Sequence, residues 1–144
     1  MLSNAFFRKL AFKVIKAYKK HIWADQKDVT GTKFKTYTSK TYEQRKKAGK
    51  IKRQSAESRG KTAPILTGDF KNDFKLLTLS SAGFTLGWAS HGSKVNYLAD
   101  NKRFVTKPTQ PLPDDIQMRI NRSVRKETER QLPQNKVIHI KVGK

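Results

Sequence analysis

The chain has 144 residues, and 32 lysines and arginines against 11 aspartates and glutamates give it a formal charge of +21. This length is typical of one domain, 1–144, and 14 aromatic side chains (8 Phe, 4 Tyr and 2 Trp) can supply a modest core. The lack of cysteine excludes disulfides, thiolate zinc sites and cysteine catalysis, and no stretch of about 18 apolar residues could span a membrane.

An amphipathic helix is predicted over residues 4–23, within an N-terminal helical segment 1–23. Apolar side chains recur every three or four positions in two adjacent rows. The rows are Leu2, Phe6, Leu10 and Val14, and Phe7, Ala11, Ile15, Tyr18 and Ile22. Lysines and arginines flank this stripe, and Ser3 suits the N-cap. We expect the stripe to pack against the protein's own sheet or a neighbouring subunit, with an anionic membrane surface as the alternative.

Residues 24–64 are predicted to form an extended basic arm. Thr38 or Ser39 can cap a short helix through Tyr42. A stretch of this length without structure is uncommon inside a compact domain, so we expect the arm to fold against a partner rather than its own core. The candidate contacts to phosphate or to an acidic neighbour are Arg45, Lys46, Lys47, Lys50, Lys52 and Arg53. The alternative is a solvated loop.

Residues 65–132 are predicted to form the α+β core. A helical turn over 69–74 precedes two strands, 76–79 and 84–88, which a turn at 80–83 joins into a hairpin. A short helix around 95–98 and a strand over 103–106 follow. The last helix begins at Pro113 and stops at Leu132-Pro133. In the tail, 133–144, residues 137–142 are predicted to form an exposed strand that adds to a sheet in this subunit or a neighbour.

The sequence offers no set of residues typical of catalysis or of metal binding. His21, His91 and His139 are too isolated for a metal site. The carboxylate pairs Asp69/Asp73 and Asp114/Asp115 are better explained by helix dipoles than by acid–base chemistry. No phosphate-binding or dinucleotide motif occurs. We therefore expect no enzyme activity and no cofactor.

Nucleic acid is one candidate partner for the charge. The segment 33–37 interleaves lysines with Phe34 and Tyr37, whose rings could stack on bases. No RNA-recognition, KH or zinc-finger pattern is present. A nucleic-acid-binding protein of the ribosome or nucleoid, which contacts phosphates without reading sequence, is therefore the alternative function.

Short motifs occur in a fixed order between about residues 25 and 130. Their residues are Asp28, Gly31, Phe34, Tyr37, Tyr42, Lys46, Leu66, Thr67, Gly68, Trp88, Tyr97, Arg103 and Phe104. In this order the motifs resemble the virion-morphogenesis or tail-completion family of tailed bacteriophages, which are small neck proteins that join head and tail.

The resemblance implies a structural virion protein without catalysis, assembled in the host cytoplasm as a ring, with a hexamer expected. Its implied partners are further copies of itself, the neighbouring connector and tail proteins, and packaged DNA in the channel. It also implies that Phe34, Tyr37 and Tyr42 anchor the arm in packing, and that Thr67-Gly68 shapes the turn into the hairpin.

Overall fold

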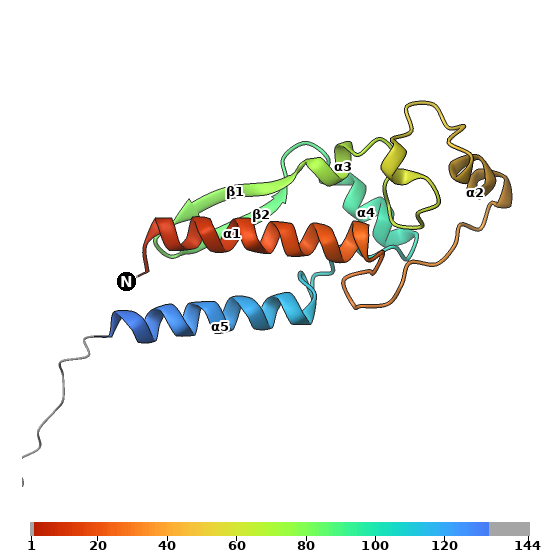
Figure 1. Ribbon diagram of the computed structural model, residues 1–144. Helices are drawn as coiled ribbons and strands as arrows, with labels where there is room; N and C mark the ends of the chain where they lie inside the picture. The colour runs from red at the N-terminus through yellow and green to blue at the C-terminus, as the bar shows by residue number, and fades with distance from the viewer. Residues whose placement is uncertain (1, 133–144) are drawn as a thin grey trace, which may run out of the picture.

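The structure, a computed structural model, describes residues 2–132 (Figure 1). In chain order the elements are α1 (Asn4–Lys19), η1 (Lys20–Ala24), α2 (Lys40–Lys47), η2 (Ala56–Ser58), α3 (Asp69–Asn72), β1 (Phe74–Ser80), β2 (Gly83–Trp88), α4 (Ser93–Asp100) and α5 (Asp114–Gln131). Helix α1 runs along the middle of the molecule, with the β1–β2 hairpin on one side and α5 on the other (Figure 1). Helices combined with one antiparallel hairpin make the fold α+β, as predicted.

Helix α1 confirms the first predicted element. The Oγ of Ser3 caps it by accepting a hydrogen bond from the N–H of Phe6 at 3.1 Å. The π-helical turn η1 extends the helix to Ala24 and buries Ile22 and Trp23 completely. The buried face of α1 consists of Phe7, Leu10, Ala11, Val14 and Tyr18. This face packs against the protein's own hairpin, which was the first of the predicted uses of the stripe.

The predicted hairpin is also confirmed. Strands β1 and β2 pair antiparallel, with Phe74 opposite Trp88 at the open end and an irregularity in the register between Leu76 and Thr78. The ring of Tyr18 stacks on Phe74 with centroids 4.2 Å apart, and Trp88 lies 4.8 Å from Phe74. These aromatic contacts attach the hairpin to α1.

One hydrophobic core joins the helices and the hairpin. Its buried members are Leu10, Val14, Tyr18, Ile22, Trp23, Phe34, Ala63, Ile65, Phe70, Phe74, Leu98, Val105 and Ile116. The buried hydroxyl of Tyr18 donates to the carbonyl of Val105 at 2.6 Å. The indole N–H of Trp23 donates to the carbonyl of Pro64 at 3.2 Å. Both aromatic side chains therefore bury their rings while their polar atoms stay paired.

The segment 24–64 corrects one prediction. We expected this arm to fold against a partner, but it packs on the protein's own core. Val29, Phe34 and Ala63 are all buried, and the last two belong to the central cluster. The segment also contains α2 and η2. Its apolar residues are widely spaced and follow neither helical nor strand periodicity, so the sequence pattern did not reveal their burial.

The C-terminal half contains a second correction. Helices α4 and α5 lie where the sequence predicted them, with Pro113 at the N-cap position of α5. The predicted strand over 103–106 is wrong, because this stretch is irregular. The carbonyl of Phe104 accepts one backbone hydrogen bond, from Val29 at 2.8 Å, and no ladder continues it within the described residues.

Helix α5 ends at Gln131, and Leu132 is already extended, as the Leu132-Pro133 signal predicted. The predicted tail 133–144, including the strand over 137–142, lies outside the described residues. Across residues 2–132, none of the helices combines the length and the apolar character needed to cross a membrane.

Candidate functional site

The basic region is organised by α2. The Oγ of Ser39 accepts a hydrogen bond from the N–H of Tyr42 at 3.2 Å, which confirms one of the two predicted caps. The cations of the last turn lie at the negative end of the helix dipole, where positive charge is stabilising. We call residues 45–53 the basic run. The short helix fixes the first part of this run in space.

The basic run turns sharply after α2. The N–H of Lys50 donates to the carbonyl of Arg45 at 2.9 Å, and that of Gly49 donates to Lys46 at 3.2 Å. This is the bonding pattern of a Schellman turn. Gly49 has a φ of +68°, a conformation that costs little only for glycine. The run is therefore a built turn rather than a free loop.

Lys46 corrects another prediction, because it is buried rather than exposed as a phosphate contact. Only 2% of its surface is accessible. Its Nζ donates to the hydroxyl of Tyr37 at 2.7 Å and to the carbonyl of Ala63 at 3.3 Å. Burial and the nearby charge of Arg103 lower the pKa of Lys46 to about 8.

Arg103 completes what we call the tyrosine–cation cluster, formed by Tyr37, Tyr42, Lys46 and Arg103. Its guanidinium lies 4.1 Å from the centroid of the Tyr37 ring and donates to the carbonyls of Thr62 and Lys35 at 2.6 and 3.0 Å. The rings of Tyr37 and Tyr42 meet edge to face at 4.8 Å. Burial raises the pKa of Tyr37 to about 12. The cluster thus joins three parts of the chain and anchors the segment 24–64, as the resemblance implied for the tyrosines.

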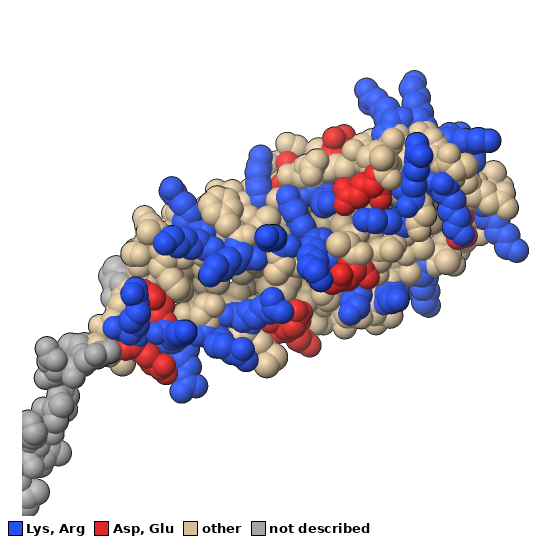
Figure 2. Space-filling model, viewed as in Figure 1, with Lys and Arg blue, Asp and Glu red and all other residues tan. Residues whose placement is uncertain are grey.

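The other cations of the basic run are exposed. They are Arg45, Lys47, Lys50, Lys52 and Arg53. Lys47 pairs with Glu43 at 3.1 Å, but this contact is largely solvent-exposed and is worth little. Lysines and arginines crowd the end of the molecule that carries α2 (Figure 2). The exposed cations therefore form a positively charged surface.

Phe34 does not take part in that surface. It is 7% exposed and belongs to the core, so it is not available to stack on a base. The interleaved segment 33–37 therefore does not act as a stacking platform. Its lysines are exposed, while its two aromatic rings pack inward.

Asp28 and Gly31 shape a turn between Lys27 and Lys33. The Asp28 carboxylate accepts hydrogen bonds from the N–H groups of Thr30 and Thr32 at 2.9 and 3.1 Å. Gly31 has a φ of +89° within this turn. The carbonyl of Asp28 also contacts Nε2 of His21 at 2.8 Å. These motif residues fix the path of the chain after η1.

The Leu66-Thr67-Gly68 motif leads into α3. The Thr67 hydroxyl accepts from the N–H of Asp69 at 3.2 Å, and Gly68 has a φ of +91° at the N-cap position. The carbonyl of Leu66 accepts from Ser55 at 2.7 Å. The predicted role of Thr67-Gly68, to shape the turn into the hairpin, fits this geometry.

The remaining motif residues are not members of the tyrosine–cation cluster, although Tyr97 lies near enough to Tyr42 to influence its charge and Phe104 directly follows Arg103. Trp88 stacks on Phe70 at 4.9 Å and donates its indole N–H to that residue's carbonyl at 2.9 Å. Tyr97 is 68% exposed on α4. Phe104 is half-buried beneath the Nζ of Lys107, which lies 4.2 Å from the ring centroid.

Asp73, one of the paired carboxylates of the sequence, has a structural role. The Asp73 carboxylate accepts from the N–H groups of Ser90 and His91 at 2.8 and 2.9 Å, and these bonds lower its pKa. It lies 3.2 Å from Nδ1 of His91. Among residues 2–132, no three His, Cys, Asp or Glu side chains gather closely enough to hold a metal ion.

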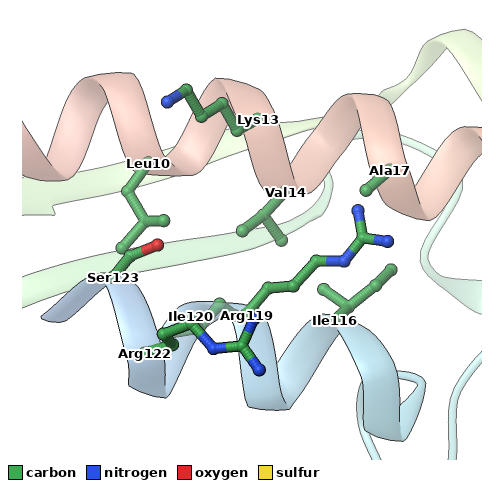
Figure 3. A pocket seen from close by; sticks show the side chains of 9 residues that line it. All are labelled: Leu10, Lys13, Val14, Ala17, Ile116, Arg119, Ile120, Arg122 and Ser123. Atoms are coloured by element: carbon green, nitrogen blue, oxygen red, sulfur yellow. The ribbon is translucent and has the colours of Figure 1, made fainter. Parts of the chain in front are cut away.

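A groove between α1 and α5 is the feature that sequence reasoning missed. It has a volume of about 330 Å³ and is lined by Leu10, Lys13, Val14, Ala17, Ile116, Arg119, Ile120, Arg122 and Ser123 (Figure 3). We call it the α1–α5 groove. Both apolar stripes were visible in the sequence, but the pattern could not show that the two helices leave space between them.

Comparison with protein-family models, with curated proteins and with solved structures finds no significant match to the chain. The resemblance to phage neck proteins therefore depends on the short motifs and their order.

Proposed function

We propose that the chain is a structural virion protein of a tailed bacteriophage, which acts at the head–tail neck in tail completion. It assembles in the host cytoplasm into a ring, with six copies expected, and becomes part of the virion. Its partners are the adjacent connector and tail proteins and the DNA that passes through the channel. On this proposal the protein performs no catalysis and needs no cofactor.

The observation that carries this proposal is that most of the motif residues hold the fold together. Tyr37, Tyr42, Lys46 and Arg103 are up to 66 positions apart in the sequence, yet they meet in one cluster. Asp28, Gly31 and Gly68 fix turns, and Phe34 and Trp88 pack in or against the core. A family of structural proteins would share residues that maintain the fold, and the motif residues of this chain have that role.

The exposed cations of the basic run add support. A neck component meets other proteins and passing DNA, and both can present negative charge to Arg45, Lys47, Lys50, Lys52 and Arg53. Symmetric repetition in a ring would let this one surface act several times in the same assembly.

Particle composition tests the proposal. Virions produced with the wild-type gene and with a deletion should be purified and compared by mass spectrometry and electron microscopy. We expect the chain in intact particles, and we expect the deletion to yield heads and tails that fail to join. Normal infectious particles that lack the chain would refute a structural role.

A specific observation also favours the second candidate, a nucleic-acid-binding protein. The exposed cations of the basic run are clustered and could contact phosphates as a monomer. Size-exclusion chromatography with light scattering, with and without duplex DNA at two salt concentrations, separates the two functions. Salt-sensitive binding by a monomer that never assembles on tail or connector proteins would favour this candidate over the neck.

A further inference from the structure

Helix α5 is attached to the molecule along a narrow strip. Among its 18 residues, only Ile116 is buried, while Ile120 and Val124 are half-buried. Helix α5 packs mainly on α1, and the hairpin covers another side of α1 (Figure 1). Where the two helices meet, Leu10, Val14 and Ile116 are nearly buried, whereas Ala17 and Ile120 remain partly exposed.

The α1–α5 groove opens along this junction. Leu10 and Val14 of α1 face Ile116 and Ile120 of α5 across it (Figure 3). Its volume of about 330 Å³ is at the low end of the range of roughly 300–1,000 Å³ that is typical of binding cavities. The lining residues cover about two turns of each helix, a length of roughly 10 Å. A short apolar face with two or three side chains would fill it.

The polar residues around the groove have one sign of charge. Lys13 lies on the α1 side, and Arg119 and Arg122 lie on the α5 side, with the Arg119 guanidinium directed toward α1 at Ala17 (Figure 3). Within the part of the chain that the structure describes, no carboxylate lines the groove. Glu127, one turn beyond Ser123, already accepts hydrogen bonds from Arg130.

We propose that the α1–α5 groove binds an acidic amphipathic helix of a partner protein. Apolar side chains of that helix pack on the partly exposed Ala17 and Ile120, above the nearly buried Leu10, Val14 and Ile116. Its flanking carboxylates pair with Lys13, Arg119 and Arg122. The bound helix would lie across α1 and α5 as a third helix and complete the packing that α5 lacks. This inference depends on the groove and is independent of the neck proposal.

The chemistry of the groove favours such a helix over other occupants. A DNA backbone supplies phosphates for the cations but nothing apolar to fill the floor. A second copy of this chain would bring a surface of the same positive sign, since the net charge is +21. An amphipathic helix satisfies both parts of the site, because its apolar stripe and its charged flanks lie on adjacent faces.

A binding experiment with charge variants tests the proposal. The probe is a synthetic peptide with leucines at i, i+3, i+4 and i+7 and glutamates on the flanks, titrated into the full chain and followed by fluorescence anisotropy. We expect Arg119→Glu and Arg122→Glu each to weaken binding by at least about tenfold. The matched control is Lys126→Glu, which makes the same charge change at an exposed position of α5 outside the groove. It should weaken binding by less than about threefold.

A second pair of variants tests the groove without changing any charge. Ala17→Phe puts bulk into the groove, whereas Ala5→Phe puts the same ring on an exposed position of the same helix. We expect loss of peptide binding for Ala17→Phe only. The circular dichroism spectrum and melting temperature of both variants should match the wild type closely enough to show that they are folded.

Four outcomes would overturn the proposal. Equal weakening by Arg119→Glu and Lys126→Glu would mean general charge attraction. Binding that survives Ala17→Phe would place the peptide elsewhere. A peptide with serine in place of leucine that binds as tightly would remove the apolar component. Vesicles with anionic lipid, or duplex DNA, that bind through the groove when the peptide does not would identify a membrane or a nucleic acid as the occupant.

Discussion

Lys46 is a charged side chain that the fold places in its interior. Its ammonium group is held by the Tyr37 hydroxyl and the Ala63 carbonyl, and the groups that shift its pKa include no carboxylate. An ammonium ion without a negative partner is costly to bury. Burial of the Lys46 charge therefore lowers the stability of the folded protein, although the hydrogen bonds of the same residue attach the segment 24–64 to the core.

The pH dependence of stability should reveal this cost. The folded-state pKa of about 8 lies below the ordinary value of 10.5, so the unfolded chain binds more protons between these two values. The contribution of Lys46 to the free energy of unfolding therefore rises from pH 8 to pH 10, by on the order of 2 kcal/mol. In urea unfolding, the free energy of unfolding of the wild type should therefore increase between pH 8 and pH 10 relative to that of Lys46→Met. If the free energies of the two proteins change in parallel with pH, Lys46 is not buried as a charged group. Measurements stay below pH 10 so that Tyr37 remains protonated.

The hydroxyl of Tyr18 provides a simpler test at the same scale. Tyr18→Phe keeps the ring that stacks on Phe74 but leaves the carbonyl of Val105 without its partner. A buried unpaired carbonyl costs about 1–3 kcal/mol. We expect a lower urea midpoint with an unchanged m-value. Tyr97→Phe, at a position that is 68% exposed, should leave the midpoint almost unchanged.

At the scale of elements, turns with positive φ hold the basic segment in shape. Gly49 ends α2 and Gly60 lies beyond η2, and both have a φ of +68°. A Cβ at Gly49 would come within 2.6 Å of the Arg59 guanidinium, whereas a Cβ at Gly60 would meet no atom within 4 Å. The two glycines therefore share a backbone requirement and differ in their surroundings.

Alanine substitutions separate these two factors. Gly49→Ala and Gly60→Ala each force a left-handed conformation on an L-residue, which costs about 1–2 kcal/mol. Because the Arg59 side chain is flexible at that end, it can move aside, so we expect similar losses for the two variants in thermal unfolding. A much larger loss for Gly49→Ala would show that Arg59 is held rigidly.

Elements with a periodic pattern or a capping signal could be predicted from the sequence, whereas the packing of the segment 24–64 on the core could not. Helices α1 and α5 and the hairpin follow from their repeats, since burial on one face imposes the repeat. The segment 24–64 is fixed by separate contacts, such as Arg103 to Thr62, that leave no periodic trace. Lys46 is indistinguishable from Lys47 in a run of like charges, and only the fold shows which one points inward. Residues 103–106 were predicted to form a short strand, but this stretch contributes Val105 to the core without forming a ladder.

At the scale of the whole molecule, positive charge is spread over the surface and is densest in the N-terminal half. Residues 1–64 contain 18 basic and 4 acidic side chains, which gives +14 of the total of +21. Both α1 and the basic run contribute, and they lie in different parts of the fold (Figures 1 and 2). The α1–α5 groove and the basic run therefore offer two separate positive surfaces.

The salt dependence of DNA binding measures how many of the phosphate contacts come from the basic run. Replacing Arg45, Lys47, Lys50, Lys52 and Arg53 by glutamine removes five exposed cations and leaves the buried Lys46 in place. If all five contact phosphate, the slope of log K against log salt should fall in magnitude by about 4.5. Lys46→Met is the control and should leave the slope unchanged. An unchanged slope in the five-site variant would exclude the basic run as a DNA contact.

The bond between Tyr18 and Val105 also constrains how the chain folds during synthesis. The two residues are 87 positions apart. Of the other rings that contact Tyr18, that of Trp23 is close in sequence, but those of Phe74 and Trp88 follow by more than 50 residues. At about 5–20 residues per second, Tyr18 leaves the ribosome roughly 4–17 s before Val105 does. During that interval the apolar face of α1 has no permanent cover. A folding helper or an early binding partner would therefore meet this cationic helix first, before the core exists.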